Sequence, residues 1–176
     1  MSGAELHSAC EALAPLVGVW RGTGDGHYPT VPDFSYLEDL EFAHIGKPFL
    51  AMTQRTRDPL SDAPLHSEVG YLRPQPRSGM ELVLTQPTGV VEIHTGTVIE
   101  TGGSLVVDLR TERVEGTRTA KPITEVRRRL EVSGDKLISE MWMAAMGQPL
   151  THHLRAELSR VDDRRGAWDL RLPGSP

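Results

Sequence analysis

Apolar residues change their spacing near residue 17. Before that point, Leu6, Ala9, Cys10 and Leu13 stand at positions i, i+3, i+4 and i+7, which places them on one face of a short helix. Pro15 follows, and the helix is expected to end there because proline lacks the backbone N–H that a helix interior needs. From residue 17 onward apolar and polar residues alternate with a period of two, which predicts β-strands.

Turn residues divide this alternating region into short strands. Thr101-Gly102-Gly103 predicts a tight turn before Ser104–Thr111, and Ser133-Gly134-Asp135 predicts a three-residue hairpin. In all, the pattern predicts ten strands, at residues 17–24, 34–45, 49–57, 66–72, 80–85, 90–97, 104–111, 123–132, 137–143 and from 150 onward.

Ten short strands without crossover helices predict an all-β antiparallel meander. Closing the meander removes its exposed edges and leaves room for one ligand inside, so we expect a ten-stranded antiparallel β-barrel of the lipocalin or fatty-acid-binding-protein type. The barrel is placed at residues 12–162, between an N-terminal tail at 1–11 and a C-terminal tail at 163–176. The short N-terminal helix either covers one mouth of the barrel or remains loose.

The last strand has two interpretations. Leu150, Leu154, Leu158 and Val161 fit one face of a helix, whereas strand alternation sets His153 on one side, with Thr151 and Arg155, and the leucines on the other. The strand is preferred because a ten-stranded barrel cannot close without it.

Composition narrows the class of protein. A hydrophobic fraction of 38% with only 5% aromatic residues suits a wall of Val, Leu and Met around a cavity. A net charge of −5 without a basic face argues against nucleic-acid binding. The single cysteine, Cys10, excludes an intramolecular disulfide, and it is expected to lie in a mobile start of the chain. With no apolar leader and no run of 18 apolar residues, we expect a soluble cytoplasmic protein that does not enter a membrane; the sequence leaves open whether it forms a homodimer.

The candidate chemistry lies at His152 and His153. The nearest acid is Glu157, four residues past His153 and about 13 Å away along a strand. An imidazole without a carboxylate partner is a poor general base, but against an apolar wall it is a good axial ligand for haem. The alternative is that one histidine is exposed and the other is a hydrogen-bonded core residue. Met143 is the best candidate for a pocket wall, and the other histidines lack the spacing of a zinc site.

Several motifs resemble the nitrobindin family, in colinear order over residues 12–161. The first is Gly18-Val-Trp-Arg-Gly-Thr-Gly24, followed at once by Asp25-Gly-His-Tyr-Pro-Thr30. The others are Pro64-Leu-His-Ser-Glu-Val-Gly-Tyr71, Pro87-Thr-Gly-Val-Val-Glu92, Thr119-Ala-Lys-Pro-Ile-Thr124 and Gly147-Gln-Pro-Leu-Thr-His-His-Leu154. One such motif occurs in other barrel families as well, whereas the ordered set is specific.

This resemblance implies a ten-stranded barrel that holds one haem b, mainly ferric, binds nitric oxide and isomerises peroxynitrite to nitrate. The family's axial histidine precedes a leucine, which assigns that catalytic and metal-binding role to His153 and leaves His152 on the opposite, solvated face. Thr30 matches a residue that contacts the haem, and Lys121 matches a lysine placed to neutralise a haem propionate. After Lys121, Pro122-Ile123 replace the acid and valine expected from the family.

Two alternatives share the fold. A metal-free carrier of fatty acids or other small apolar ligands would use the same barrel, with Arg127 or Arg155 binding an anionic head group if either points inward. A haem sensor would share the site and differ only in its downstream partner.

Overall fold

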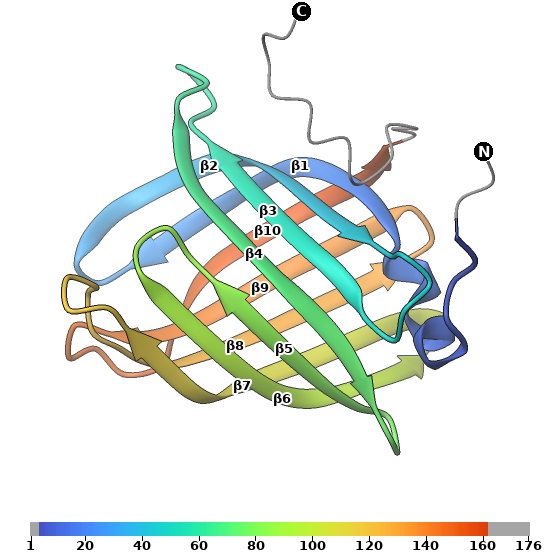
Figure 1. Ribbon diagram of the computed structural model, residues 1–176. Coiled ribbons are helices and arrows are strands. Elements are labelled where there is room, and N and C mark those ends of the chain that lie inside the picture. Colours follow the sequence, from blue (N-terminus) through green and yellow to red (C-terminus); the bar gives the residue numbers. More distant parts are fainter. Residues whose placement is uncertain (1–3, 162–176) are drawn as a thin grey trace, which may run out of the picture.

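The computed structural model describes residues 4–161 and forms a closed antiparallel barrel of ten strands (Figure 1). Each strand pairs with its neighbours in the chain, and β1 pairs with β10 to close the sheet. The strands are β1 (Gly18–Tyr28), β2 (Val31–Ala43), β3 (Leu50–Arg57), β4 (Pro64–Gln75), β5 (Gly79–Thr85), β6 (Val90–Thr101), β7 (Ser104–Gly116), β8 (Ile123–Ser133), β9 (Lys136–Ala145) and β10 (Thr151–Val161). The all-β barrel prediction is confirmed, including a strand rather than a helix from residue 151. The predicted C-terminal tail at 163–176 lies outside the described residues.

The first two strands are longer than predicted. Asp25, Gly26 and Pro32 suggest loop, yet β1 runs to Tyr28 and β2 starts at Val31. Their register shifts between Gly26 and Tyr28: Pro32 and Asp33 of β2 lie opposite the single residue His27 of β1, so the β-bulge is on β2. The bulge allows this polar, glycine-containing segment to remain paired almost to the turn.

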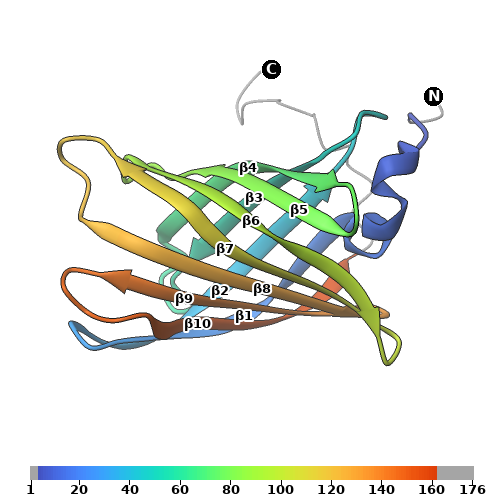
Figure 2. The ribbon, with the colours of Figure 1, turned by 90° about the horizontal axis from the view of Figure 1, so that it is seen from below.

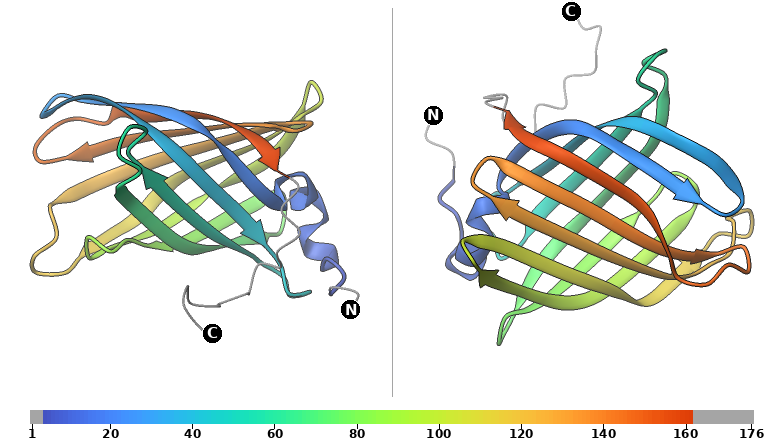
Figure 3. Two further views of the ribbon diagram at one scale, coloured as in Figure 1. Left: turned by 90° about the horizontal axis from the view of Figure 1, so that it is seen from above. Right: turned by 180° about the vertical axis from the view of Figure 1, so that it is seen from behind.

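A 3₁₀ helix, η1 (Ser8–Leu16), lies across one end of the barrel (Figure 2 and Figure 3). Pro15 lies inside it, so the prediction that the helix ends at Pro15 was wrong. Arg160 on β10 explains how the end is held: its guanidinium donates hydrogen bonds to the carbonyl oxygens of Pro15, at 2.7 Å, and Val17, at 2.5 Å. None of the helices within residues 4–161 combines the length and apolar character needed to span a membrane.

The helix closes its end of the barrel with apolar side chains. Cys10, Leu13 and Leu16 are fully buried, and the Trp20 indole donates a hydrogen bond to the Leu16 carbonyl at 2.8 Å. The expectation that Cys10 lies in a mobile start was therefore wrong. A thiol behaves as a small hydrophobic group, and here it belongs to the core. Burial also raises the pKa of the Cys10 thiol.

Two inward-facing glycines of β1 make room for aromatic rings from β2. A Cβ atom on Gly24 would lie 2.3 Å from the ring of Tyr36, and one on Gly26 would lie 2.2 Å from the ring of Phe34. Both pairs are direct cross-strand neighbours in the β1–β2 register. Gly24, the last glycine of the Gly-x-Trp-x-Gly-x-Gly motif, and Gly26, two residues beyond it, therefore allow these rings to pack against β1, where they shape the wall beside β10.

Candidate functional site

His153 lies at a β-bulge. The register between β10 and β9 skips one residue between His152 and Leu154, so His153 is the extra residue. A bulge changes the direction of the side chain that carries it. As a result, His153 and its neighbour Leu154 both line the same cavity inside the barrel. The prediction from strict alternation, which put them on opposite faces, was wrong for this reason.

The cavity has a volume of about 530 Å³ and runs along the barrel. Around His153 its wall is mainly apolar, with Phe34 from β2, Met141 and Met143 from β9, and Leu154 from β10. Met143 thus lines the cavity, as the sequence analysis expected.

A backbone carbonyl orients the His153 ring. Its Nδ1 atom lies 2.9 Å from the carbonyl oxygen of His27, the β1 residue that lies opposite the bulge of β2. A carbonyl oxygen can only accept, so Nδ1 carries the proton and Nε2 keeps its lone pair. Burial lowers the pKa of His153 and outweighs the hydrogen bond to His27, which favours the neutral ring. A neutral imidazole with one nitrogen held by a carbonyl is the form that ligates metals.

Two aromatic rings flank the imidazole edge-on. The centroid of Tyr28 lies 5.0 Å from that of His153, and the centroid of Phe34 lies 6.2 Å away. Tyr28 is fixed at its other end, because its hydroxyl accepts a hydrogen bond from the Ala145 N–H at 2.9 Å and donates one to the Ala145 carbonyl at 3.1 Å. Tyr28 therefore links the His153 ring to the backbone of β9.

The other candidate residues lie outside the cavity lining. His152 is exposed, 3.3 Å from Glu140 and edge-on to Trp142. Thr30 lies in the β1–β2 turn and Lys121 in the β7–β8 connection, both exposed. These two turns are at the same end of the barrel, opposite η1 (Figure 1).

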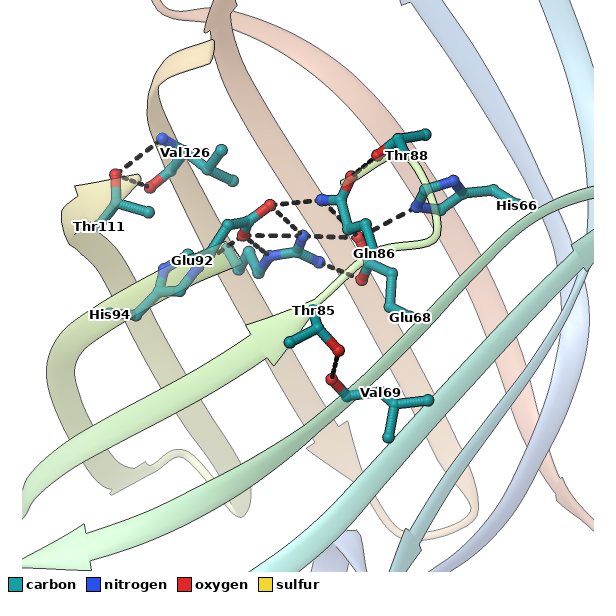
Figure 4. Close-up of polar contacts among 11 residues, drawn as sticks. His66, Glu68, Val69, Thr85, Gln86, Thr88, Glu92, His94, Thr111 and Val126 are labelled. Carbon is teal, nitrogen blue, oxygen red and sulfur yellow. Dashed lines mark hydrogen bonds and ion pairs between the residues drawn. The ribbon is translucent and has the colours of Figure 1, made fainter. Parts of the chain in front are cut away.

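The interior also holds a charged cluster that was not predicted from the sequence. Arg128 on β8 donates to Glu68 on β4, at 2.7 and 2.8 Å, and to Glu92 on β6, at 3.1 and 3.2 Å. All three residues are at most 8% exposed. Gln86 bridges the two carboxylates, His94 contacts Glu92, and His66 lies 3.5 Å from Glu68 (Figure 4).

Opposite charges balance within this cluster. Burial alone would raise the pKa of Glu68, but the Arg128 charge and hydrogen bonds from His66 and Arg128 hold it below its ordinary value. Burial would likewise lower the pKa of Arg128, yet Glu68 and Glu92 raise it. Glu68 and Arg128 stay ionised in the interior because each gives the other the charged partner that replaces the water lost on burial.

Glu38 on β2 is a different kind of buried carboxyl. It is 2% exposed, and Gln54 donates a hydrogen bond to its Oε1 at 3.0 Å. Burial raises the pKa of Glu38 from 4.5 to about 7, with Glu68 adding to the rise and Gln54 and Arg128 opposing it. At neutral pH this carboxyl is therefore held in part as the neutral acid.

The raised pKa of Glu38 makes the protein less stable as pH rises. The folded state keeps this proton up to about pH 7, whereas the unfolded chain releases it near 4.5, so stability falls across that window. The full effect is about 3 kcal/mol. In urea unfolding, E38Q should therefore gain stability relative to the natural chain between pH 5 and pH 8. The same substitution outside the barrel, E157Q, should show no such gain; a flat difference for E38Q would contradict the assignment.

The residues of the cavity fit a haem better than a bare ion. Within residues 4–161, no three His, Cys, Asp or Glu side chains come together in a geometry that could hold a metal ion. A porphyrin supplies four nitrogen ligands to its iron, so the protein has to supply only an axial ligand. His153, with a free Nε2 lone pair in an apolar part of the cavity, meets that requirement.

Comparisons with known proteins agree with this architecture. A family model described as a THAP4-like, heme-binding beta-barrel domain matches residues 9–160. The chain is 46% identical over 157 residues to peroxynitrite isomerase 2 of Mycobacterium marinum, which covers 89% of this chain and 98% of the relative. It is 44% identical over 155 residues to the peroxynitrite isomerase of Nocardia farcinica, covering 88% and 92%.

A solved structure supports the fold independently. The crystal structure of Rv2717c from M. tuberculosis matches with a TM-score of 0.87 at 45% identity, covering 89% of this chain and 99% of that one. Both the ten-stranded barrel and the resemblance on the sequence motifs are thereby confirmed. The chain belongs to the nitrobindin family, whose members carry this haem-binding β-barrel domain.

Proposed function

We propose that this protein holds one haem b, with ferric iron bound by Nε2 of His153, and isomerises peroxynitrite to nitrate; nitric oxide would bind at the same iron. The observation that carries the proposal is the His153 ring, oriented by the His27 carbonyl at 2.9 Å within the cavity. The relatives named peroxynitrite isomerase, at 44–46% identity over most of the chain, support the reaction.

The reaction requires little from the protein except that it position the cofactor and the substrate. Peroxynitrite and nitrate contain the same atoms and carry the same charge, so the overall conversion needs no external reductant or net proton. When bound, the ferric haem supplies the redox-active iron for this rearrangement. His153 would hold the haem through its ring nitrogen, Tyr28 and Phe34 flank its ring, and Met141, Met143 and Leu154 would exclude water around it.

Thr30 and Lys121 are proposed as contacts at the rim. Both lie in exposed turns at the end of the barrel opposite η1. A lysine ammonium there is suited to a haem propionate, and a threonine hydroxyl can donate a hydrogen bond to it.

The structure disfavours a carrier of fatty acids. Arg127 pairs with Asp108 at 2.5 Å and stacks on Trp142 outside the cavity lining, and Arg155 pairs with the exposed Glu157. Arg128 does face inward, but it is already engaged by two glutamates. No arginine of the described barrel is left to bind a fatty-acid carboxylate in the cavity.

The test is a titration of the purified chain with haemin, followed by mixing with peroxynitrite. We expect a Soret band at one haem per chain, and faster peroxynitrite decay with nitrate as the product than free haemin gives at the same concentration. The haem-free chain is the control. No Soret change, or decay no faster than with free haemin, would refute the proposal.

A further inference from the structure

The inner part of the cavity is chemically unlike the part beside His153. On β2, Phe34 lies next to His153, and Glu38 comes four residues later, about 13 Å further along the strand. We call the region around Glu38 the inner chamber. It is bounded by polar residues of several strands, namely Glu38, Gln54, Glu68, Glu92 and Arg128.

Negative groups outnumber positive ones in the wall of this cavity. Five carboxyl residues line it, against a single arginine and no lysine: Glu38, Asp58, Glu68, Glu92, Glu140 and Arg128. The guanidinium of Arg128 donates its hydrogen bonds to Glu68 and Glu92. An anionic ligand in the inner chamber would therefore meet repulsion from these carboxyl groups and find no free cation, whereas the wall beside His153 is mainly apolar.

Glu38 is left without a cationic partner. Gln54 donates to its Oε1 atom, whereas its Oε2 atom has no hydrogen-bond partner among the described residues. The side chain is 2% exposed and lines the cavity. A buried carboxyl with an unused oxygen facing a cavity is a ready acceptor for a ligand's N–H groups.

The surroundings suggest what the rest of such a ligand would be. Tyr36 and Gln54 provide further oxygen atoms on the same wall. Apolar side chains line the cavity from the neighbouring strands, namely Leu40, Phe42, Met52, Leu72, Leu82 and Leu109. A small ammonium head and an unbranched alkyl chain match this combination of one acceptor carboxyl and an apolar wall.

We propose that the inner chamber binds small aliphatic amines as ammonium ions, with the head group on Glu38 and the alkyl chain along the apolar wall. This site is separate from His153 and does not depend on the proposed isomerase function. A fatty-acid carrier with the same kind of barrel binds an anionic head group, whereas this site would bind a cationic one.

Such binding would release a proton. Gln54 on β3, Glu68 on β4 and Arg128 on β8 face Glu38, and Asp39 is its neighbour on β2; together with burial these groups hold the pKa of Glu38 at about 7. Tyr36 lies near Glu38 on the same strand. An ammonium ion needs the carboxylate form. Affinity should therefore rise about tenfold per pH unit below pH 7 and level off above it.

The experiment compares three probes of equal length: octylammonium, octanoate and octanol. Isothermal titration of the full chain, with and without bound haemin, is run from pH 5.5 to 8.5. We expect octylammonium to bind at least tenfold more tightly than either other probe at pH 8. Binding should persist with haemin present, because Glu38 lies well inward of His153.

Substitution of Glu38 provides the matched control. E38Q should weaken octylammonium binding at least tenfold and remove its pH dependence, while E157Q on the barrel exterior should change neither. Circular dichroism confirms that each variant is folded.

Several results would overturn the proposal. These are octanoate or octanol binding as tightly as octylammonium, no octylammonium binding, natural affinity in folded E38Q, or loss of binding when haemin is loaded. Should E38Q fail to fold, the comparison of the three probes on the natural chain still decides the question. The Soret titration is read separately, so failure here and failure of haem binding are distinguishable.

Discussion

Replacing His153 with alanine is expected to abolish specific haem binding and peroxynitrite isomerisation together. The substitution removes the imidazole whose Nε2 lone pair is kept free by the 2.9 Å contact between Nδ1 and the His27 carbonyl. No neighbouring side chain replaces it, since His152 is exposed on the outside of β10. We expect haem affinity to fall by more than about 100-fold, or roughly 3 kcal/mol. A haemin titration followed at the Soret band measures this loss.

His152 offers a control on the adjacent residue. H152A removes a histidine that contacts Glu140 and Trp142 on the barrel exterior, so haem binding should remain within about twofold of the natural chain. If H153A kept its Soret band and its activity while H152A lost them, the axial assignment would pass to His152. If both variants bound haem normally, neither histidine would be the ligand.

Replacing Arg128 with methionine is expected to be among the most destabilising single changes in the barrel. It leaves Glu68 and Glu92 buried at 3% and 0% exposure without their cation. Breaking a buried ion pair from one side costs about 3–5 kcal/mol, because the remaining charge has neither water nor a partner. For a chain of this size that corresponds to a drop in Tm of roughly 10 °C. Urea and thermal unfolding measure both quantities.

Two further variants separate charge from packing. R155A breaks an exposed pair with Glu157 and should cost less than about 1 kcal/mol. The triple variant E68Q/E92Q/R128M removes all the charges together and should recover most of the stability lost by R128M alone. If R128M cost no more than R155A, the buried cluster would not stabilise the fold.

The architecture was accessible from the sequence because it depends on local patterns. Alternation of period two and glycine-rich turns, such as Thr101-Gly102-Gly103 and Ser133-Gly134-Asp135, mark each strand and its end, and consecutive antiparallel strands pair with their neighbours. The sequence predictions that proved wrong were those for which the local composition indicates a structure other than the observed one. Pro15 suggested a helix end, but η1 continues to Leu16, and the Pro15 carbonyl in its last turn accepts a hydrogen bond from Arg160, 145 residues away.

The buried cluster left a readable signal in the same alternation. Glu38 stands between Tyr36 and Leu40 on the inward face of β2, and Arg128 stands between Val126 and Leu130 on that of β8. A charged residue at a position that the alternation assigns to the apolar face is expected to be buried. Which carboxylates meet Arg128 could not be predicted, since Glu68 lies 60 residues away and the partner depends on how the barrel closes across its interior.

The sequence by itself determined the strands, the closed barrel, the family and the identity of the candidate ligand, because period-two alternation and short motifs are properties of neighbouring residues. Only the tertiary structure decided how His153 reaches the cavity. By alternation its side chain should face away from that of Leu154, and the bulge in the β10–β9 pairing brings it in. The His27 carbonyl that orients it is 126 residues distant and lies opposite a second bulge, which is in β2. Bulges and the contacts between them arise from register between strands, which no single segment encodes.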